Sequence, residues 1–596
     1  MRVVATAGHV DHGKSTLVRA LTGMEPDRWA EERRRGMTID LGYAWTELAS
    51  GEQLAFVDVP GHQRFIGNML AGLGPAPAVL LVVAADAGWS RQSAEHLAAV
   101  HALRLRHGLL AITRSDLADP GPALAAARER IGRSSLGEVP AVCVSAVTGA
   151  GLPELRAALG SLAAGLPEPR QDGRVRLWVD RSFTVRGAGT VVTGTLGAGT
   201  VRAGDRLLAG DRPVVVRGLQ QLGRDAAEAA AVARVALNLR GAGPAELGRG
   251  DVLLTPDAWH HSRALDVRLE RFTEHAAGEP AGEPASLPAE LMLHLGTATV
   301  PVRVRPLGEG HARLSYDRPL PVQVGDRAIL RDPGRQAVAA GVLVLDADPP
   351  ALRRRGAAAR RAAELAGLGG RPNLAAEVRR RGAAHRNLLE SLGIPTEAGA
   401  PGVRTEAGWL IADGTWQAWL AQAPAAVATW AADHPLEPGM PAEALRRAAG
   451  IPHRDLLPAL IRQAGLVAEE GRVRAPGQAV TLSASEAAVA TVERRLAADP
   501  FAAPERYELA ELRLGRRELA AAERAGRLLR IAEDLVLLPD APGRAARLLA
   551  GLPQPFTLSE ARQALGTTRR VAVPLLEYLD AETITERLPD SRRRLR

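Results

Sequence analysis

The first part of the chain alternates short apolar runs with stretches of helical periodicity. Over residues 1–168 the apolar runs are rich in β-branched residues, and they read RVVATAG, QLAFVDV, PAVLLVVAA, GLLAIT and AVCVS. Such alternation is typical of a parallel sheet that is covered by helices. The turn-forming segment GLPEPRQDG that follows indicates a linker. We therefore predict an α/β domain over residues 1–168.

A different pattern extends from about residue 174 to 348. Here valine-rich runs are separated by glycines, with no helical stretches between them; examples are RVRLWVD, GTVVTGTL, RPVVVRGL, ARVALNL, TVPVRVRPL, GHARLSY and AGVLVLDA. Strands at this spacing predict two β-barrels. A break near residues 256–261 separates them, so we expect one barrel over 174–256 and the other over 259–348.

After residue 350 the chain becomes helical, rich in alanine and arginine, and repetitive. EALRRAAGIPHRDLLPALIRQAGLVAEEGRVR, YELAELRLGRRELAAAERAGRLLRIAEDLVLL and the last 41 residues each show a short helix, a glycine, a second helix and a β-rich turn, and NLAAEVRRRGAAHRNLLESLG begins a looser copy. A helix-turn-helix followed by a hairpin is a winged helix. The spacing of about 60 residues fits four of them, over 351–420, 421–480, 481–540 and 541–596. Alanine-driven self-similarity in a plain helical segment is the alternative.

Composition adds three constraints. The net charge of +8 fits a polyanionic partner such as RNA, although solubility alone would explain it equally well. The only cysteine, Cys143, cannot form an internal disulfide, which indicates a reducing cytoplasm, and its apolar run favours a place in the core. No apolar run approaches the roughly 20 residues of a membrane helix, and the N-terminus lacks a signal-peptide layout. We expect no membrane association.

A glycine-rich string links the first apolar run to the helical stretch STLVRALTG. It fits the phosphate-loop pattern G-x-x-x-x-G-K-[ST] with Gly8, His9, Val10, Asp11, His12, Gly13, Lys14 and Ser15. We expect its N–H groups to surround one anion, Lys14 to bridge the β- and γ-phosphates, and Ser15 to bind Mg²⁺. Thr16 and the helix N-terminus would face the α-phosphate. Lys14 is the chain's only lysine, so its site requires a compact ammonium rather than a planar guanidinium.

Two further strings lie where a magnesium and γ-phosphate site needs them. DVPGH closes the run QLAFVDV, so Asp58 can hold a magnesium-bound water, and the N–H of Gly61 can reach a γ-phosphate and release it. RGMTID lies between the two motifs, and Thr38 is the candidate second hydroxyl ligand of Mg²⁺. Taken alone, each string is a weak indication of a nucleotide site, and Thr38 by itself would be interpreted as a surface threonine.

The base-reading motif is expected at the ends of the last two of the five apolar runs. TRSD follows GLLAIT, and Asp116 can accept hydrogen bonds from guanine N1–H and the exocyclic amine, a pair that adenine does not offer. Ser145 and Ala146 follow AVCVS and can support the base through backbone N–H groups. Five strings in this order, each at the carboxyl end of a strand, make a strong combined signal, because ligands of open α/β sheets bind there.

These motifs resemble the translational GTPases typified by elongation factor Tu. GHVDHGKST, RGMTID, DVPGH, TRSD and SA carry the resemblance, and the two barrels are similar to that family's second and third domains. With the helical tail, nearly the whole chain resembles the bacterial selenocysteine-specific elongation factors. DRSFTVRGAGTVVTGT is similar to the start of their second domain, and GTTRRVAVPLLEYLD to their RNA-binding winged helix.

The resemblance implies GTP and Mg²⁺ as cofactors and ribosome-stimulated hydrolysis. His62 would position the attacking water, and Val10 and Met37 match the apolar pair that keeps this histidine away until the ribosome is contacted. Catalysis would rest on positioning and charge stabilisation. The family pattern departs from the common N-K-x-D at Thr113 and Arg114. Thr113 lacks the carboxamide with which asparagine contacts the guanine base. Arg114 can still pack its methylene chain and planar guanidinium along the base.

The resemblance also implies the partners. The protein would carry selenocysteinyl-tRNA to a ribosome paused at a recoded UGA codon, with the second barrel contacting the tRNA. A selenol ionises near neutral pH, so a basic pocket lined by Asp180, Arg181 and Arg234 would recognise it by charge. A surface ion pair of Asp180 with Arg181 is the alternative. We expect a monomer.

The last winged helix would bind an mRNA hairpin. Hydroxyls and N–H groups at a helix start suit phosphate, arginines suit phosphate or guanine edges, and hairpin loops expose unstacked bases. The candidate contacts are Thr567, Thr568, Arg569, Arg570, Arg592, Arg593 and Arg594. The alternative is a basic tail without sequence-specific binding.

Two rival functions remain at this stage. A general translation factor of the elongation or initiation type would have only a nonspecific nucleic-acid-binding tail. A nucleotide-gated regulator would use its winged helices on DNA, and it would not need two barrels shaped for tRNA.

Overall fold

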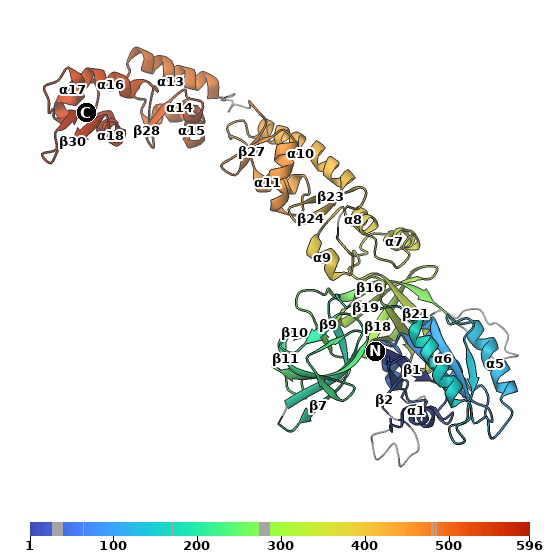
Figure 1. Cartoon of the computed structure of the whole chain (residues 1–596). Coiled ribbons are helices and arrows are strands. Elements are labelled where there is room, and N and C mark those ends of the chain that lie inside the picture. Colours follow the sequence, from blue (N-terminus) through green and yellow to red (C-terminus); the bar gives the residue numbers. More distant parts are fainter. Residues whose placement is uncertain are drawn as a thin grey trace. The chain divides into compact units, whose positions relative to one another are not determined.

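The protein divides into two compact units. The computed structural model describes the chain except residues 27–37, 39, 63–64, 170, 188, 273–286, 398, 478–481 and 483–484. One unit consists of Met1–Leu374 with His385–Ala398, and the other of Ala375–Ala384 with Gly399–Arg596 (Figure 1). In the described part of the chain no helix is long and apolar enough to cross a membrane.

The N-terminal domain is a six-stranded sheet with the order β2-β3-β1-β4-β5-β6. Its strands are β1 (Arg2–Ala7), β2 (Gly42–Glu47), β3 (Gln53–Asp58), β4 (Ala78–Ala84), β5 (His107–Thr113) and β6 (Ala141–Cys143). The five predicted runs pair in parallel, and β2 adds an antiparallel edge strand. The β4 strand is buried throughout, as expected for a central parallel strand.

Helices cover both faces of this sheet. Residues of α3 (Ile66–Leu73), α4 (Arg91–Ala102) and α5 (Gly121–Gly132) pack into one apolar core. Residues of α1 (Lys14–Thr22) and α6 (Leu152–Ala164) pack into the other. The predicted doubly covered sheet is therefore present, and its strand ends carry the candidate site.

Two barrels follow. The first has the order β10-β15-β7-β8-β14-β11-β12 and is joined again by pairing of β10 with β11. Its strands are β7 (Arg176–Val185), β8 (Gly189–Leu196), β10 (Arg206–Ala209), β11 (Arg212–Gln221), β12 (Arg224–Ala226), β14 (Ala233–Arg240) and β15 (Val252–Leu254), and a small sheet pairs β9 (Thr200–Arg202) with β13 (Glu228–Ala230).

The second barrel is closed, with the order β16-β19-β18-β17-β20-β21. Its strands are β16 (His261–Glu270), β17 (Glu290–Leu295), β18 (Ala298–Gly308), β19 (His311–Pro321), β20 (Arg327–Asp332) and β21 (Ala337–Asp346). The sequence ATVPVRVRPLG of β18 alternates buried apolar with exposed residues, which is the pattern of a strand with one face in a barrel core.

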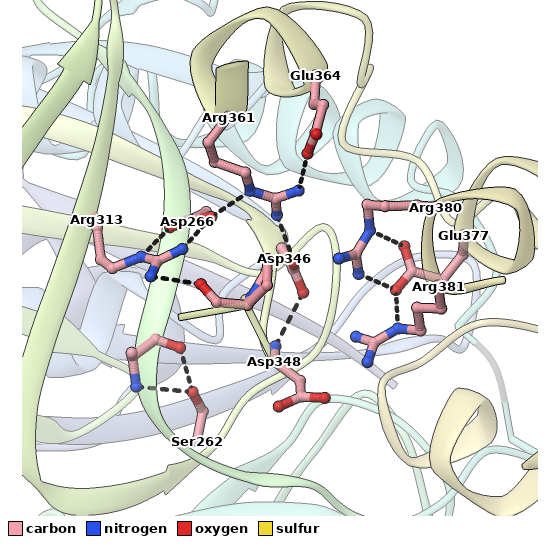
Figure 2. Close-up of polar contacts among 12 residues, drawn as sticks. Ser262, Asp266, Arg313, Asp346, Asp348, Arg361, Glu364, Glu377, Arg380 and Arg381 are labelled. Carbon is pink, nitrogen blue, oxygen red and sulfur yellow. Dashed lines mark hydrogen bonds and ion pairs between the residues drawn. The ribbon is translucent and has the colours of Figure 1, made fainter. Parts of the chain in front are cut away.

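A buried ionic network fastens the next helix, α7 (Ala357–Ala366), to the second barrel (Figure 2). The guanidinium of Arg361 is 2% exposed and pairs with Asp266 and Asp346. Arg313 also pairs with Asp266, through two hydrogen bonds of 2.7 and 2.9 Å. Breaking one partner of such a buried network is costly, so α7 is held firmly on the barrel.

The second unit contains the winged-helix elements. They are α8 (Leu374–Arg381), β22 (Ala383–His385), β23 (Val403–Glu406), β24 (Trp409–Ala412), α10 (Asp413–Asp433), β25 (Met440–Pro441), α11 (Ala442–Ala448), the 3₁₀ turn η2 (Arg454–Leu456), α12 (Leu457–Gln463), β26 (Val467–Glu469) and β27 (Arg472–Arg474). The last two repeats contain α13 (Glu486–Ala498), α14 (Arg506–Glu511), α15 (Arg516–Arg524), β28 (Leu529–Ala532), β29 (Leu535–Leu537), α16 (Ala541–Ala550), α17 (Leu558–Ala564), α18 (Arg569–Ala581), β30 (Thr585–Arg587) and β31 (Arg593–Leu595). These two repeats share one apolar core.

The predicted limits of the first winged helix need correction. Helix α10 continues through the proposed boundary at 420/421. In addition, α7 and α9 (Arg386–Ser391) belong to the unit of the barrels. The reason is long-range pairing: besides the network around Arg361, the N–H of Val324 donates to the carbonyl of Leu392 at 3.0 Å. Such contacts join residues far apart in sequence, which helical periodicity does not reveal.

Candidate functional site

The phosphate loop connects β1 to α1 and depends on glycine. Gly8 has a φ of 144°, and a Cβ there would lie 2.2 Å from the carbonyl oxygen of Val82. Gly13, at φ 77°, precedes the helix. The buried Lys14 ammonium donates to the carbonyls of Gly8 at 3.1 Å and His9 at 2.8 Å. The loop therefore wraps around the lysine side chain, and its carbonyls hold the ammonium.

Three oxygen-bearing side chains meet at the start of α1. The Ser15 hydroxyl donates to Asp58 Oδ2 at 2.6 Å and lies 2.9 Å from the hydroxyl of Thr38. The other carboxylate oxygen of Asp58 accepts a 2.7 Å hydrogen bond from Thr6. Residues from three separate motifs thus converge on one point. Oxygen groups of this kind are the ligands that Mg²⁺ prefers.

Gly61 lies directly against the phosphate loop. A Cβ at this position would lie 2.5 Å from the nitrogen of Val10 and 2.6 Å from Lys14 Nζ, so only glycine fits. The next residue, His62, is half-buried, and its ring lies 6.0 Å from that of Phe65. Met37, the predicted partner of Val10 beside this histidine, lies outside the described residues.

The base-reading residues lie beside the same loop. The buried Thr113 hydroxyl donates to the carbonyl of His12 at 2.7 Å, so this threonine holds the loop in place. The guanidinium of Arg114 binds Asp86 at 2.9 Å and the carbonyl of Asp11. This leaves the arginine stem, rather than its head, for a base. Asp116 is exposed.

The loop after β6 completes this edge of the sheet. Ser145 is buried, its N–H donates to the carbonyl of Ala150 at 2.9 Å, and its hydroxyl accepts from the N–H of Thr148. Ala146 is half-buried beside it. Within the phosphate loop, His9 and Val10 are half-buried and Asp11 and Thr16 are exposed. The predicted nucleotide residues are therefore gathered at one edge of the sheet.

Two side chains of α4 that the sequence did not single out also hold the phosphate loop. The N–H of Gly8 donates to His96 Nδ1 at 3.0 Å, and the N–H of Val10 donates to Gln92 Oε1 at 3.3 Å. Burial lowers the pKa of His96 to about 3, assisted by nearby Lys14, so the ring is neutral and can accept. The motif pattern contains no signal for these contacts, because they join residues more than 80 positions apart.

The predicted aminoacyl residues form a second cluster. Arg234 pairs with the buried Asp180 at 2.6 and 2.8 Å, and Thr193 donates to the same carboxylate at 2.7 Å. Burial alone would lower the pKa of Arg234, but Asp180 outweighs it and raises the pKa above its ordinary value. The guanidinium stays charged. The alternative of a surface pair of Asp180 with Arg181 is wrong, since the partner of Asp180 is Arg234.

The wall of this cluster comes from the N-terminal domain. Tyr43 on β2 donates its hydroxyl to Asp180 at 3.2 Å, and the Arg234 guanidinium lies 3.8 Å from the centre of the Tyr43 ring. Burial raises the pKa of Tyr43, so its hydroxyl remains a donor. A cavity beside them is lined by β2 and β3 on one side and by Arg181, Phe183, Thr193 and Arg234 on the other. Sequence reasoning missed Tyr43 and Thr193.

The predicted RNA contacts of the last winged helix divide into two groups. Thr567 is buried and donates to the carbonyl of Phe501 at 2.7 Å, while Arg570 donates to the carbonyls of Ala503 and Pro504. Arg593 is buried and pairs with Asp580 at 2.9 Å.

The prediction therefore needs correction at Thr567, which joins the last winged helix to the preceding one, and at Arg593, which fastens β31 to α18 within the last one. Arg570 serves the same packing with part of its guanidinium. The exposed members of the set are Thr568, Arg569, Arg592 and Arg594.

Comparison with known proteins agrees with this geometry. Residues 1–164 match the family model of the elongation factor Tu GTP-binding domain. Together with the phosphate loop, this match defines a GTP-binding translational GTPase. Residues 284–351 match the β-barrel domain of selenocysteine-specific elongation factors, and residues 547–594 match the winged helix of elongation factor SelB.

Whole-chain relatives settle the family. The selenocysteine-specific elongation factor of Escherichia coli is 32% identical over an alignment of 627 positions, gaps included, which covers 98% of this chain and 97% of that protein. The chain belongs to the selenocysteine-specific elongation factors. The match to the Desulfomicrobium baculatum factor is 38% identical but covers 57% of this chain and 55% of that protein. A solved bacterial selenocysteine-specific elongation factor, EF-Sec, shares the fold over 100% of both chains, with a TM-score of 0.75 at 24% identity.

Proposed function

We propose that this protein uses GTP to deliver selenocysteinyl-tRNA to the ribosome at recoded UGA codons in the cytoplasm, recruited by an mRNA hairpin that its last winged helix binds. The observation that carries the proposal is the pairing of Arg234 with Asp180 beside the cavity between the first barrel and β2. This pocket places charged, buried groups where the N-terminal domain meets the barrel.

The nucleotide site fits GTP with Mg²⁺. The Ser15 and Thr38 hydroxyls would hold the cation, and Asp58 would act on a water bound to it. The cation supplies neutralisation of charge on the phosphates. The loop N–H groups and Lys14 would hold the phosphates, and the N–H of Gly61 would contact the γ-phosphate. The base would rest against Thr113, Arg114, Asp116, Ser145 and Ala146.

Hydrolysis would depend on His62. It directly follows Gly61, which lies against the phosphate loop, and this neighbourhood supports a role for the imidazole in orienting a water toward the γ-phosphate. Catalysis would then rest on placing that water and on stabilising the charge that develops between the phosphates. Contact with the ribosome would bring the imidazole into the position where it orients this water.

The pocket would recognise the selenolate by its charge. Arg181, Arg234 and Arg249 surround Asp40 and Asp180, so three guanidinium groups against two carboxylates give these five side chains one net positive charge. A selenolate would balance it, whereas the neutral hydroxyl of a seryl ester would not. Because burial strengthens electrostatic contacts, this difference would be larger here than at the surface.

The tail would read RNA through the side chains that stay exposed. Thr568 and Arg569 begin α18, and Arg592 and Arg594 lie at the β30–β31 hairpin. Arginines in this arrangement suit phosphates and the exposed base edges of a hairpin loop. Hairpin binding would place the factor next to the codon.

A ternary-complex assay tests the proposal. Selenocysteinyl-tRNA and seryl-tRNA on the same tRNA would be offered in parallel to the protein with GTP, and protection of each ester from hydrolysis would be measured. We expect strong protection of the selenocysteinyl ester and weak protection of the seryl ester. Equal protection of both would refute the selenocysteine assignment and would favour a general translation factor.

A further inference from the structure

Arg249 lies between the nucleotide site and the aminoacyl pocket. It precedes β15 in the first barrel, and its guanidinium contacts three separate segments. One nitrogen pairs with the carboxylate of Asp40, a second donates to the side-chain oxygen of Asn68, and Nε donates to the main-chain carbonyl of Asp180 at 3.2 Å. A planar guanidinium, unlike an ammonium, offers N–H groups in these fixed directions.

Two of these segments continue directly into the nucleotide site. Asp40 stands two positions after Thr38, whose hydroxyl contacts Ser15. Asn68 lies in α3, the helix that follows Gly61. Arg249 therefore contacts both chain segments that would sense the γ-phosphate.

The third contact reaches the pocket. The main-chain carbonyl of Asp180 accepts a hydrogen bond from Arg249, and its carboxylate pairs with Arg234. Asp40 reinforces the link, because its second oxygen pairs with Arg181 at 3.1 Å. Arg181 also donates to the carbonyl of Leu41. One carboxylate thus holds a pocket arginine and Arg249 together.

We propose that Arg249 is a positioning residue that couples the nucleotide state to the aminoacyl pocket. The inference rests on the proposed function. With both nucleotide-site segments in place, Arg249 holds the Asp180 main chain and shares Asp40 with Arg181, and the pocket is assembled. When either segment moves after hydrolysis, Arg249 loses a partner, and the Asp180 strand loses its support. This gives the coupling two discrete sites and named contacts between them.

The test compares tRNA affinity in two nucleotide states. Selenocysteinyl-tRNA would be titrated into the full-length protein with a non-hydrolysable GTP analogue and with GDP, for the wild type, Arg249→Gln and Arg249→Lys. We expect Arg249→Gln to weaken binding about tenfold with the GTP analogue and to leave it unchanged with GDP. Arg249→Lys should recover little, because one ammonium does not reach all three partners.

Arg318→Gln is the matched control. Arg318 contacts the residues that follow Arg249, donating to the carbonyl of Gly250 at 3.0 Å and to Asp251 at 2.7 Å, but from the second barrel. We expect it to keep the wild-type ratio of affinities between the two nucleotide states. An unchanged ratio in Arg249→Gln, or an equal loss in both states, would overturn the inference.

A second measurement needs no tRNA. Hydrogen exchange of β7, residues 176–185, would be compared with the GTP analogue and with GDP. We expect the analogue to increase protection in the wild type and in Arg318→Gln, but not in Arg249→Gln. If the wild-type protein does not bind selenocysteinyl-tRNA, the proposed function is refuted. The role of Arg249 is then still decided by this exchange experiment, which uses no tRNA. Equal protection in the wild type and Arg249→Gln would refute the coupling.

Discussion

The phosphate loop and the last winged helix both gather basic and hydroxyl side chains at the start of a helix, but they use them differently. At α1, Lys14 binds carbonyls of its own loop, and Ser15 contacts Thr38 and Asp58 from two other motifs. At α18, by contrast, Thr567 and Arg570 bind carbonyls of residues 501–504. At α1 the contacts stay within the N-terminal domain and bring three separate motifs to the start of one helix. In the tail the same residue types first hold two winged helices together.

The largest effect is expected at Lys14. Lys14→Ala should weaken GTP binding about 100-fold or more, because removing one member of a buried, charge-assisted contact costs about 2–5 kcal/mol. Titration with a fluorescent GTP analogue measures it. Arg19→Ala on the same helix is the control, since Arg19 is exposed and pairs with Glu25, and it should bind as the wild type does. Full affinity and turnover in Lys14→Ala would contradict the role of the loop.

The tail offers the sharpest test of the contrast, in two neighbouring arginines. Arg593→Ala should destabilise the last winged helix by about 1–3 kcal/mol, because it leaves Asp580 without this partner in a mostly buried setting. Native-state hydrogen exchange of α18 in the full chain measures the loss.

The exposed Arg594 should behave in the opposite way. Arg594→Ala is expected to leave exchange in α18 unchanged and to weaken binding of an RNA hairpin several-fold, because it removes one phosphate or base contact. If Arg593→Ala lowered RNA affinity without loosening α18, the division between packing and contact residues would be wrong.

The buried histidine behind the phosphate loop predicts a pH dependence. Folding lowers the pKa of His96 from 6.5 to about 3, so below pH 6.5 the unfolded chain binds a proton that the folded chain does not. Stability is full above pH 6.5 and falls as the pH decreases, by about 1.4 kcal/mol per unit for this group.

Denaturant unfolding of the N-terminal domain signal between pH 6.5 and 4 checks this prediction. His96→Gln should give a shallower slope, with a residual from His12, whose pKa burial lowers to about 4. A His96→Gln slope equal to the wild type would show that His96 does not stay neutral.

The smallest effect is expected at Thr113. Thr113→Val keeps the shape of the side chain but removes the hydroxyl that holds the carbonyl of His12. The net value of one such hydrogen bond is about 1 kcal/mol, so GTP affinity should fall roughly five-fold. Preference for GTP over ATP should persist, because Asp116 would read the base. Lost discrimination would show that Thr113 itself contacts guanine.

The sequence predicted the elements that local pattern determines. Five apolar runs became the parallel strands, and the residues Ser15, Thr38 and Asp58 from three motifs lie together. These succeed because strand periodicity and phosphate-loop geometry are encoded within a few residues. The valine-rich runs predicted the barrels for the same reason.

Contacts between distant segments could not be predicted in this way. The hydrogen bonds of His96, Tyr43 and Arg249 join residues that lie 69 to 209 positions away. No local pattern distinguishes these side chains from others on a helix, strand or turn. Likewise, Arg593 and Arg594 are adjacent and alike, and only the pairing with Asp580 decides which one faces inward.

The central claim is that a charged pocket beside the GTP site selects selenocysteinyl-tRNA. Ligand binding by the Arg234→Ala variant tests this claim most directly. Affinities for selenocysteinyl-tRNA and for GTP would be measured separately, with the full-length protein. The account predicts at least tenfold weaker tRNA binding, with GTP affinity as in the wild type. Unaltered tRNA binding would contradict it and would place amino-acid recognition elsewhere.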